Sequence, residues 1–173
     1  MILYRNNNNR GLRMNKPSNE EILNEFRIFD EDKFSLIISS TSKENIPLTN
    51  YSPFVKKDGN YYISVSSNLP HYKNMIDTKQ AHIMIMQDEK EASHIYARKR
   101  LYFNAACELI ENKDEIFDLF DERYGKDLTF LRDMNDFAVI KLIPQDKSLV
   151  LGFGGAYLMN TKGELIQKTI SHK

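Results

Sequence analysis

From Leu48 onward the chain reads Leu48-Thr-Asn-Tyr-Ser-Pro-Phe-Val55, then Lys56-Lys57-Asp58-Gly59, then Asn60-Tyr-Tyr-Ile-Ser-Val-Ser-Ser67. The first and last of these segments are rich in β-branched and aromatic residues, which predicts two strands. The Asp58-Gly59 dipeptide between them is the sequence signal of a tight β-hairpin. An antiparallel sheet is therefore the first structural expectation.

Further strands are expected on both sides of this hairpin. Phe34 to Ser40 precedes it, and Ala81 to Gln87 follows with apolar residues at successive positions, which is typical of a strand buried on both faces. Pro144 is expected to separate two of the later strands. The later predicted strands are Arg98 to Ile110, Asp136 to Ile143, Leu149 to Phe153 and Ala156 to Met159.

Three helical segments interrupt the predicted strands. Ser18 and Glu21 have the spacing of a capping box, and apolar residues follow at helical spacing, so a helix is expected from Ser18 onward. Pro70 to Thr78 predicts a short helix, and a third helix begins near Asn112 and closes at Gly125. Strands joined by hairpins, with only a few short helices inserted, favour a mainly β fold and an antiparallel barrel over a βαβ sheet.

Length and composition limit the class of protein. A chain of 173 residues is most simply one domain, expected here over residues 18–160, with a tail of residues 1–17 before it and a tail of residues 161–173 after it. The 24 lysines and arginines equal the 24 aspartates and glutamates, which argues against a dedicated nucleic-acid binder. No apolar run is long enough to span a membrane and the N-terminus lacks a signal-peptide pattern, so a cytoplasmic protein is expected.

The first residues and the single cysteine are expected to have no catalytic role. Four consecutive asparagines, Asn6 to Asn9, predict a disordered N-terminal tail, and Met14 is the expected translation start because a helix start follows it at once. Cys107 is the only cysteine, which excludes an internal disulfide and a multi-cysteine metal site. It lies in an apolar strand pattern and is interpreted as a core residue.

Three short motifs contain residues that strand formation does not require. Arg98 and Arg100 share one face of a predicted strand, where two guanidinium groups can bind a phosphate or carboxylate; a solvated strand end is the alternative. The glycines of Gly152-Phe-Gly-Gly-Ala-Tyr157 weaken a strand and indicate a close backbone approach or a bulge. His71 follows Ser66-Ser-Asn68 at a helix start, where it either donates to a phosphate or propionate or caps the helix without a ligand.

Five segments occur in an order and spacing that are more specific for a protein family than any single segment. They are Tyr51 to Val55, Ser66 to His71, Ala97 to Leu101, Asp136-Phe137 and Gly152 to Tyr157. This order resembles the haem-utilisation proteins of the HugZ/HutZ type, which belong to the pyridoxamine-phosphate-oxidase-like split-barrel superfamily. The common ligand of that superfamily is FMN. The resemblance extends over residues 20 to 160, nearly the whole predicted barrel.

The resemblance implies an antiparallel split β-barrel that forms a homodimer, with the ligand at the subunit interface. Members of the family bind haem and are associated with its oxidative opening, and their axial histidine comes from a segment near the C-terminus. It further implies that Asp136 is a partner of that histidine, that His71 and Arg100 line the haem pocket, and that Tyr157 packs at the interface.

His172 is the candidate haem-iron ligand. A haem iron binds a neutral imidazole, and a carboxylate on the other ring nitrogen fixes the tautomer, a role that Asp136 can fill across a dimer interface. The chain departs from the family here, because relatives carry glycine before the ligand histidine and extend further, whereas this sequence reads Ile170-Ser171-His172-Lys173. The alternative is that His172 binds no ligand and is only the penultimate residue of a tail.

Three functions stay open at the level of sequence. The first is haem binding with oxidative haem degradation for iron acquisition, which requires an external electron donor because the chain shows no redox residue. The second is an FMN-binding oxidoreductase of the same fold, with Arg98 or Arg100 on the FMN phosphate. The third is a haem carrier without turnover. None of the three involves nucleic acid or a membrane as partner.

Overall fold

The computed structural model describes residues 17–152 and 155–170, with the backbone alone for 167–170. The predicted N-terminal tail, the expected start at Met14, and the segment that contains His172 lie outside the described residues. Within the described ranges, no helix combines the length and hydropathy of a transmembrane span.

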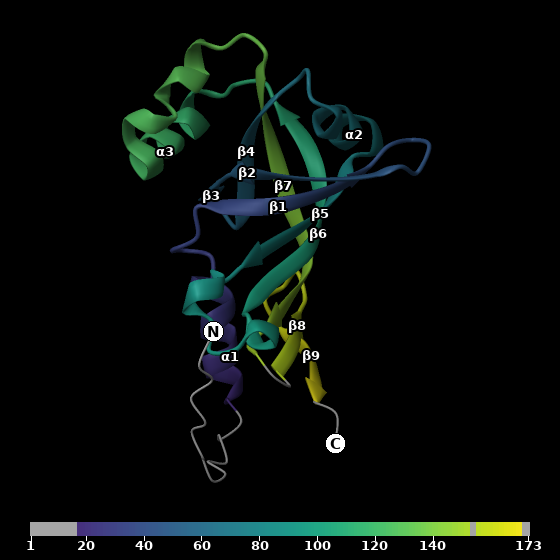
Figure 1. Cartoon of the computed structure of the whole chain (residues 1–173), viewed down its shortest axis with the longest axis vertical. Coiled ribbons are helices and arrows are strands. Elements are labelled where there is room, and N and C mark those ends of the chain that lie inside the picture. The colour runs from purple at the N-terminus through teal and green to yellow at the C-terminus, as the bar shows by residue number, and fades with distance from the viewer. Residues whose placement is uncertain (1–16, 153–154, 171–173) are drawn as a thin grey trace, which may run out of the picture.

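The described residues form one antiparallel sheet of nine strands, which curls into a half-barrel (Figure 1). Its central path runs β2-β1-β5-β6-β7-β4-β3, and β8 pairs with both β7 and β9. The prediction of a mainly β, antiparallel fold is therefore confirmed. The strands are β1 (Ser35–Thr41), β2 (Pro47–Pro53), β3 (Val55–Lys57), β4 (Asn60–Ser66), β5 (Gln80–Met86), β6 (Arg100–Ile110), β7 (Phe137–Val150), β8 (Gly155–Met159) and β9 (Leu165–Ile170).

Three α-helices cover parts of the sheet, and Figure 1 shows α2 and α3 at one end of it and β8 and β9 at the other. They are α1 (Asn19–Ile28), α2 (Pro70–Thr78) and α3 (Asp114–Tyr124), with short 3-10 turns at Glu89–Glu91, Ile95–Ala97, Gly125–Asp127 and Thr129–Asp133. The predicted capping box of α1 is confirmed, because Glu21 N donates to Ser18 Oγ at 3.2 Å and Ser18 N donates to Glu21 Oε2 at 2.7 Å. These two bonds satisfy backbone donors that have no partner within the helix.

The predicted hairpin is present between β3 and β4. Asp58 and Gly59 both have positive φ values, 51° and 77°, and Lys57 pairs with Asn60. That backbone suits the right-handed twist of the flanking strands, which is why an Asp-Gly pair occurs there. Phe54, fully buried, separates β2 from β3, so the predicted strand from Leu48 to Val55 is two strands.

Two hydrophobic clusters hold the fold together. The larger lies inside the curl of the sheet and includes Tyr61, Phe103 and Phe54, each at most 1% exposed. The smaller lies under α3 and includes Phe117 and Phe120. Burying one such large side chain contributes about 1.5–3 kcal/mol, so the curled sheet and α3 are each fixed by their own apolar contacts.

One buried carboxylate links α1 to the sheet. Asp30, just after α1, is fully buried and accepts from Lys56 Nζ at 2.6 Å and from the Tyr61 hydroxyl. Burial of Tyr61 and the negative charge of Asp30 raise the pKa of the Tyr61 phenol well above 10.0. Because a buried charge without partners costs several kcal/mol, this arrangement fixes the end of α1 against β3 and β4.

The sequence prediction of two strands separated by Pro144 was wrong. One strand, β7, runs from Phe137 to Val150. Its pairing with β6 shifts between the partners Phe103↔Lys147 and Ala105↔Pro144. Proline cannot donate a ladder hydrogen bond, and the bulge places it where no donor is required.

Two more features of the sheet differ from expectation. In β5 only one face is buried: Ala81, Ile83 and Ile85 lie in the core, whereas His82 is exposed and Met84 and Met86 are half-buried. The prediction of burial on both faces was wrong because methionine and histidine here face outward from the half-barrel. Strand β9 was not predicted, and it pairs antiparallel with β8.

Candidate ligand-binding site

His71 lies in the first turn of α2 and is only 2% exposed. Its Nδ1 atom is 3.0 Å from the side-chain amide nitrogen of Asn50 in β2. The amide oxygen of Asn50 accepts from Tyr51 N at 2.8 Å, which fixes the amide with its NH₂ group toward the histidine. His71 Nδ1 is therefore an acceptor, and the proton of the neutral ring is on Nε2.

Burial keeps His71 neutral. Desolvation lowers the pKa of His71 below its ordinary value of 6.5, because the imidazolium loses more by leaving water than the neutral ring does. The ring thus presents one N–H donor, at Nε2, from a fixed orientation. Such a group can donate to an anion without carrying charge itself.

Asp136 lies immediately before β7 and faces the loop between β4 and α2. Its Oδ2 atom accepts from Ser66 Oγ at 2.7 Å and from Asn68 Nδ2 at 3.2 Å, and its carbonyl accepts from Ser67 N at 2.7 Å. Both side-chain bonds end on Oδ2, so among the described residues Oδ1 accepts none. The carboxylate is held in place with one oxygen left for another donor.

We call His71, Asn50, Asp136 and the loop Ser66–Asn68 the upper region. The sequence predicted His71 and Asp136, and the structure brings both to the end of the sheet that carries α2 (Figure 1). Asn50 was not predicted. Its only sequence signal is its place in a strand beside Tyr51 and Ser52, which gives no indication of a contact 21 residues away.

Arg98 and Arg100 lie at the opposite end, near the start of β6. Arg98 precedes that strand rather than lying on it, so the predicted shared strand face of the two arginines was wrong. Its Nε and Nη2 donate to Gln87 O at 3.0 and 2.7 Å, and its Nη1 pairs with Glu89 at 2.9 Å. Three of the five N–H donors of this guanidinium are thus used, and its charge is already paired with Glu89.

Arg100 has far more free hydrogen-bonding capacity. Its Nη1 donates to Arg98 O at 3.2 Å, and no carboxylate of residues 17–152 or 155–170 is within ion-pair distance of it. A guanidinium has five N–H donors, so four are left for a carboxylate or phosphate. Of the two predicted arginines, Arg100 is the one suited to bind an anionic ligand.

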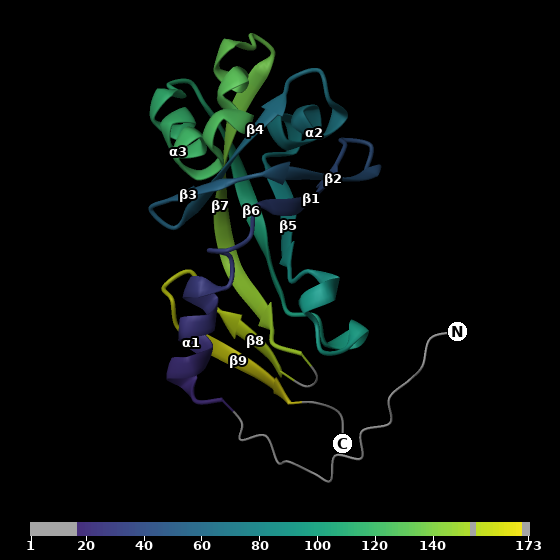
Figure 2. The ribbon, with the colours of Figure 1, turned by 60° about the vertical axis from the view of Figure 1, so that its left-hand side comes forward.

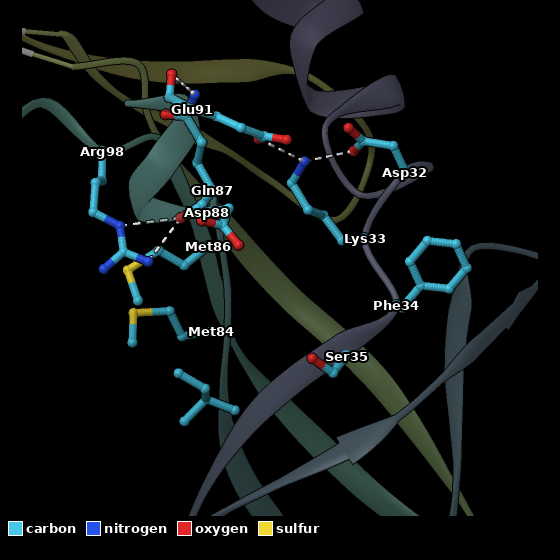
Figure 3. Close-up of a pocket in the computed structure, with 11 residues that line it drawn as sticks. Asp32, Lys33, Phe34, Ser35, Met84, Met86, Gln87, Asp88, Glu91 and Arg98 are labelled. Carbon is cyan, nitrogen blue, oxygen red and sulfur yellow. Dashed lines mark hydrogen bonds and ion pairs between the residues drawn. The ribbon is translucent and has the colours of Figure 1, made fainter. Parts of the chain in front are cut away.

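A groove of about 500 Å³ lies beside Arg98 (Figure 3). Its apolar part consists of Met84 and Met86 from β5, Ile37 from β1, and Phe34. Lys33 is on the far side, paired with Asp32 at 2.7 Å and with Glu91 at 3.9 Å. We call this groove, with Arg98 and Arg100, the lower region.

The sequence analysis missed the two methionines as groove residues. The alternation of His82, Met84 and Met86 along β5 was present in the sequence, but runs of apolar residues are ambiguous between one-sided and two-sided burial. Across the ladder, Met86 is directly opposite Arg100, and Met84 is opposite Tyr102. Met86 and Arg100 therefore lie side by side on the same face of the sheet.

The glycine motif lies against the arginine motif. Gly152 has φ +100°, a left-handed conformation that favours glycine, and a Cβ atom there would come within 3.5 Å of Ala97 O. Gly155 is covered by the ring of Tyr157, since a Cβ atom on Gly155 would be 3.2 Å from the Tyr157 hydroxyl. Tyr157 is half-buried in β8, opposite Leu149 and Lys168.

His172 lies outside the described residues, and the last described residue before it is Ile170. Strand β9 ends at Ile170, which pairs with Gly155, and Leu151 N donates to Gly155 O at 2.8 Å. Val150, the neighbour of Leu151, pairs with Arg100. Ile170 therefore lies at the lower end of the sheet, with β8 and β7 between it and Arg100 in β6.

Asp136 of the upper region and Arg100 of the lower region are far apart within one chain. Asp136 precedes the first residue of β7, and Arg100 is opposite its last residue, Val150. At about 3.3 Å per residue, β7 spans roughly 45 Å along its path. Figure 2 shows the same separation, with α2 at the opposite end of the sheet from β8 and β9.

Other reactive groups are unsuited to chemistry at this site. Cys107 is 2% exposed, and burial raises the pKa of its thiol to about 12, which confirms its interpretation as a core residue. The described residues contain no cluster of three or more His, Cys, Asp or Glu side chains able to hold a metal ion.

Comparison of the sequence with known proteins finds a relative that is similar over most of the chain. The chain is 31% identical over 137 residues to the protein named haem oxygenase HutZ from Vibrio cholerae, covering 77% of this chain and 78% of that protein. The chain belongs to the HutZ family of haem-utilisation proteins. No family model matches the sequence.

Solved structures of HutZ and of more distant proteins have a similar fold. A Vibrio cholerae HutZ structure, described as a haem storage protein, matches with a TM-score of 0.67 and 25% identity over 86% of this chain and 95% of that one. Campylobacter jejuni ChuZ matches with a TM-score of 0.81 and 24% identity over 91% and 68%. A Listeria innocua protein assigned to the pyridoxamine 5'-phosphate oxidases matches with a TM-score of 0.61 and 18% identity over 76% and 100%.

Proposed function

We propose that this protein binds haem and opens it oxidatively to release iron, using electrons from an external donor. Family membership carries the proposal, because the relative at 31% identity is named a haem oxygenase. A HutZ structure is described as that of a haem storage protein. Storage or transport without turnover is therefore the alternative that experiment must separate from degradation.

The apolar residues and the available arginine of the lower region support haem binding there. Met84, Met86 and Ile37 provide an apolar surface for a porphyrin, and Arg100 has free donors for a propionate. The opposite wall carries Asp32 and Glu91 around Lys33, and these carboxylates repel propionates. The charge distribution thus favours an orientation with the propionates toward Arg100.

The upper region supplies polar groups of the kind a haem site needs. Asp136 Oδ1 is able to accept from the N–H of an imidazole, which fixes the tautomer of an iron ligand and increases its basicity. His172 is the proposed ligand. His71 presents Nε2–H as a neutral donor, suited to a propionate or to a polar group at the iron. When bound, haem supplies the oxygen-activating chemistry.

The separation of the two regions supports a homodimer. A ligand that contacts both Arg100 and Asp136 is far smaller than the roughly 45 Å of β7 that separates them in one chain. We propose that residues 18–160 form the barrel, that residues 161–173 carry His172 from the lower end, and that a two-fold axis brings this end against the upper region of the second protomer. Each site would then combine Arg100 and His172 of one copy with Asp136 and His71 of the other.

An apolar row on the outer face of the sheet supports the same arrangement. Tyr51, Ile37, Met84 and Tyr102 are consecutive ladder partners across β2, β1, β5 and β6. Tyr51 is 69% exposed and the other three are half-buried in the single chain. Such a row across four strands suits a surface covered jointly by a ligand and a second protomer better than open solvent.

A hemin titration followed by visible absorption tests the proposal. Saturable formation of a sharp Soret band, changed in the His172→Ala variant, is the expected result. An identical spectrum in that variant would remove His172 as the ligand. Ascorbate and oxygen are then added: decay of the Soret band with ring-opened product supports the oxygenase, whereas an unchanged band supports the carrier.

The FMN alternative has its own outcome in the same experiment. Yellow protein as purified, with no specific haem uptake, would favour an FMN-binding oxidoreductase. Flavin retention should then fail in Arg100→Ala, because a phosphate would lose its guanidinium partner. Retention in that variant would eliminate Arg100 as the phosphate ligand.

A further inference from the structure

We propose that Lys147 is a nucleophilic amine that captures small, uncharged aldehydes as an imine, at a site separate from the residues assigned to haem. This inference goes beyond the proposed function and does not depend on it. It rests on three observations: Lys147 faces the interior of the half-barrel, its nitrogen has no ion-pair partner, and a cavity lies beside it.

A bulge in β7 accompanies the inward direction of Lys147. The register of β7 against β6 shifts between the pairs Phe103↔Lys147 and Ala105↔Pro144. Phe103, the ladder partner of Lys147, is 1% exposed and belongs to the core inside the curl of the sheet. Residues directly opposite each other on neighbouring strands share one face of the sheet, so Lys147 faces inward with Phe103. Bulges often re-aim a side chain in this way.

The nitrogen of Lys147 lies against two aromatic rings. Its Nζ atom is 5.2 Å from the centre of the Tyr61 ring and 5.7 Å from the centre of the Phe103 ring. Within the part of the chain that the structure describes, no carboxylate is within ion-pair distance of this nitrogen. The nitrogen keeps contact with solvent, because it is not one of the fully buried, unpaired side-chain atoms of the described residues.

The charges nearest to Lys147 are already balanced without it. The fully buried carboxylate of Asp30 accepts from Lys56 Nζ at 2.6 Å and from the Tyr61 hydroxyl. One carboxylate therefore serves two amines, and Lys56 is the amine that holds it. An ammonium group at Lys147 would add a second positive charge beside Lys56, at a position partly removed from water. Both effects favour the neutral amine.

The pKa of Lys147 agrees with this balance of charges. Desolvation lowers the pKa of Lys147 below its ordinary value of 10.5, Asp30 opposes this change, and Lys56 adds to it. Removal from water and a neighbouring cation are the two conditions that activate a lysine as a nucleophile. Lys147 is therefore neutral, and reactive, in a larger fraction of molecules than an exposed lysine is.

A cavity of about 280 Å³ lies beside Lys147. The hairpin residues Asp58–Asn60 line it on one side, and Asn160, Thr161 and Gly163 of the turn between β8 and β9 line it on the other. Figure 2 shows this turn and the hairpin between β3 and β4 on the same side of the molecule. The volume is near the lower limit of ligand sites in proteins, so the ligand is a small molecule.

The covalent step consumes no oxidant and no reductant. The lone pair of neutral Lys147 Nζ adds to the carbonyl carbon of the aldehyde, and a proton passes from nitrogen to oxygen to give a carbinolamine. Loss of its hydroxyl group, together with the remaining proton on nitrogen, releases one water and leaves a C=N double bond. The unprotonated imine is neutral, so it adds no charge beside Asp30 and Lys56. Addition of water reverses both steps.

The surroundings of the amine select the kind of aldehyde. Asp58 places a carboxylate in the cavity lining, and no described residue pairs with the Lys147 nitrogen to neutralise a second anion. An anionic aldehyde is therefore disfavoured by charge repulsion. The rings of Tyr61 and Phe103 beside the nitrogen suit an apolar substituent. A short aliphatic aldehyde meets these requirements.

Reductive trapping tests the proposal. The full chain as purified, without added haem, is incubated at pH 7 with butanal and sodium cyanoborohydride, and modified lysines are located by peptide mass spectrometry over time. We expect butylation of Lys147 ahead of Lys162, an exposed lysine in the turn beside the cavity. Lys147→Met should lose this early label, whereas Lys162→Met should keep it. Protein unfolded in urea should show no preference for Lys147.

A second aldehyde tests the selection by charge. Glyoxylate carries a carboxylate next to its aldehyde group, so the ratio of labelling at Lys147 to labelling at Lys162 should fall relative to butanal. An equal ratio for the two probes would overturn the preference for uncharged aldehydes.

The folded wild type alone decides the main point, even if Lys147→Met does not fold. Labelling of Lys147 no earlier than Lys162 in the wild type would overturn the proposal. Persistence of the early label in a folded Lys147→Met protein would also overturn it, because another amine would then be the nucleophile. These measurements contain no haem, so failure of the proposed function would leave their outcome unchanged.

Discussion

The upper and lower regions differ in how far their polar groups are satisfied. In the upper region Asn50, Ser66 and Asn68 hold His71 and Asp136 by hydrogen bonds of 2.7–3.2 Å, and one acceptor and one donor are left over. In the lower region Arg100 keeps most of its donors and the groove beside it is open. Under the proposed function, the upper region would orient a partner group and the lower region would receive the ligand.

This difference explains why neither end is a complete site. Among the described residues, no imidazole donates to the Asp136 carboxylate of the upper region. In the lower region, no described histidine lines the groove. Ile170, the last described residue before His172, lies at the lower end of the sheet, away from Asp136. In the proposed homodimer, the upper region of one protomer would complement the lower region of the other.

The largest expected effect comes from mixing defective protomers. Asp136→Ala and Arg100→Ala are each expected to weaken haem binding by about tenfold or more. Co-expressed with different tags and purified as the mixed dimer, they should recover one intact site per dimer, because each site takes Asp136 from one copy and Arg100 from the other. The measurement is haem stoichiometry by titration. No recovery in the mixed dimer would show that each site belongs to a single protomer.

Removing the orienting carboxylate should have the next largest effect. Asp136→Ala is expected to weaken haem affinity by about 10–100-fold, the usual cost of losing a partner of a metal-bound histidine. Ser66→Ala is the matched control, since it removes one bond to Oδ2 and leaves Oδ1 in place, and its loss should be much smaller. The haem affinity of each variant is measured by competition with apomyoglobin. Equal losses in the two variants would contradict the role assigned to Oδ1.

The two arginines should behave differently in the lower region. Arg100→Ala is expected to cost about 1.5–3 kcal/mol of ligand binding, the value of a charge-assisted hydrogen bond. Arg98→Ala should change binding little, because its guanidinium is occupied by Gln87 O and Glu89. Isothermal titration with hemin measures both. A larger loss in Arg98→Ala would reverse the assignment.

The smallest effect concerns pH and the buried histidine. The pKa of His71 is lowered in the folded state, so below pH 6.5 the unfolded chain binds a proton that the folded chain does not. Its contribution to stability is therefore fully present above pH 6.5 and is lost as the pH falls below that value. His71→Gln should show a flatter decline of urea-unfolding free energy between pH 7 and pH 5. If the slope of unfolding free energy against pH is unchanged in His71→Gln, groups other than His71 cause the loss of stability at low pH.

Local sequence signals predicted the elements that depend on neighbouring residues. The capping box at Ser18 and the turn at Asp58-Gly59 are both present, because each is decided by bonds or torsions within four residues. The prediction failed at Pro144, where a bulge in pairing with β6 lets one strand continue. A bulge depends on the partner strand, which the local sequence does not contain.

The residues of the candidate site divide in the same way, into those predicted from local sequence and those that depend on packing. His71, Arg100 and Asp136 were predicted because their residue types and order resemble a family. Asn50, which fixes the His71 tautomer, and the outward Met84 were not predicted, since both depend on which strands are neighbours and which face of β5 is covered.

The sequence by itself determined the fold class, the family, and three chemical types proposed for the ligand site: guanidinium, imidazole and carboxylate. Only the tertiary structure decided that Arg98 is occupied while Arg100 is available, that β5 turns its methionines outward, and that the two halves of the site lie at opposite ends of β7. The physical reason is that residue types and turns are local properties. Hydrogen-bond saturation, burial and distance depend on which segments of the chain pack together.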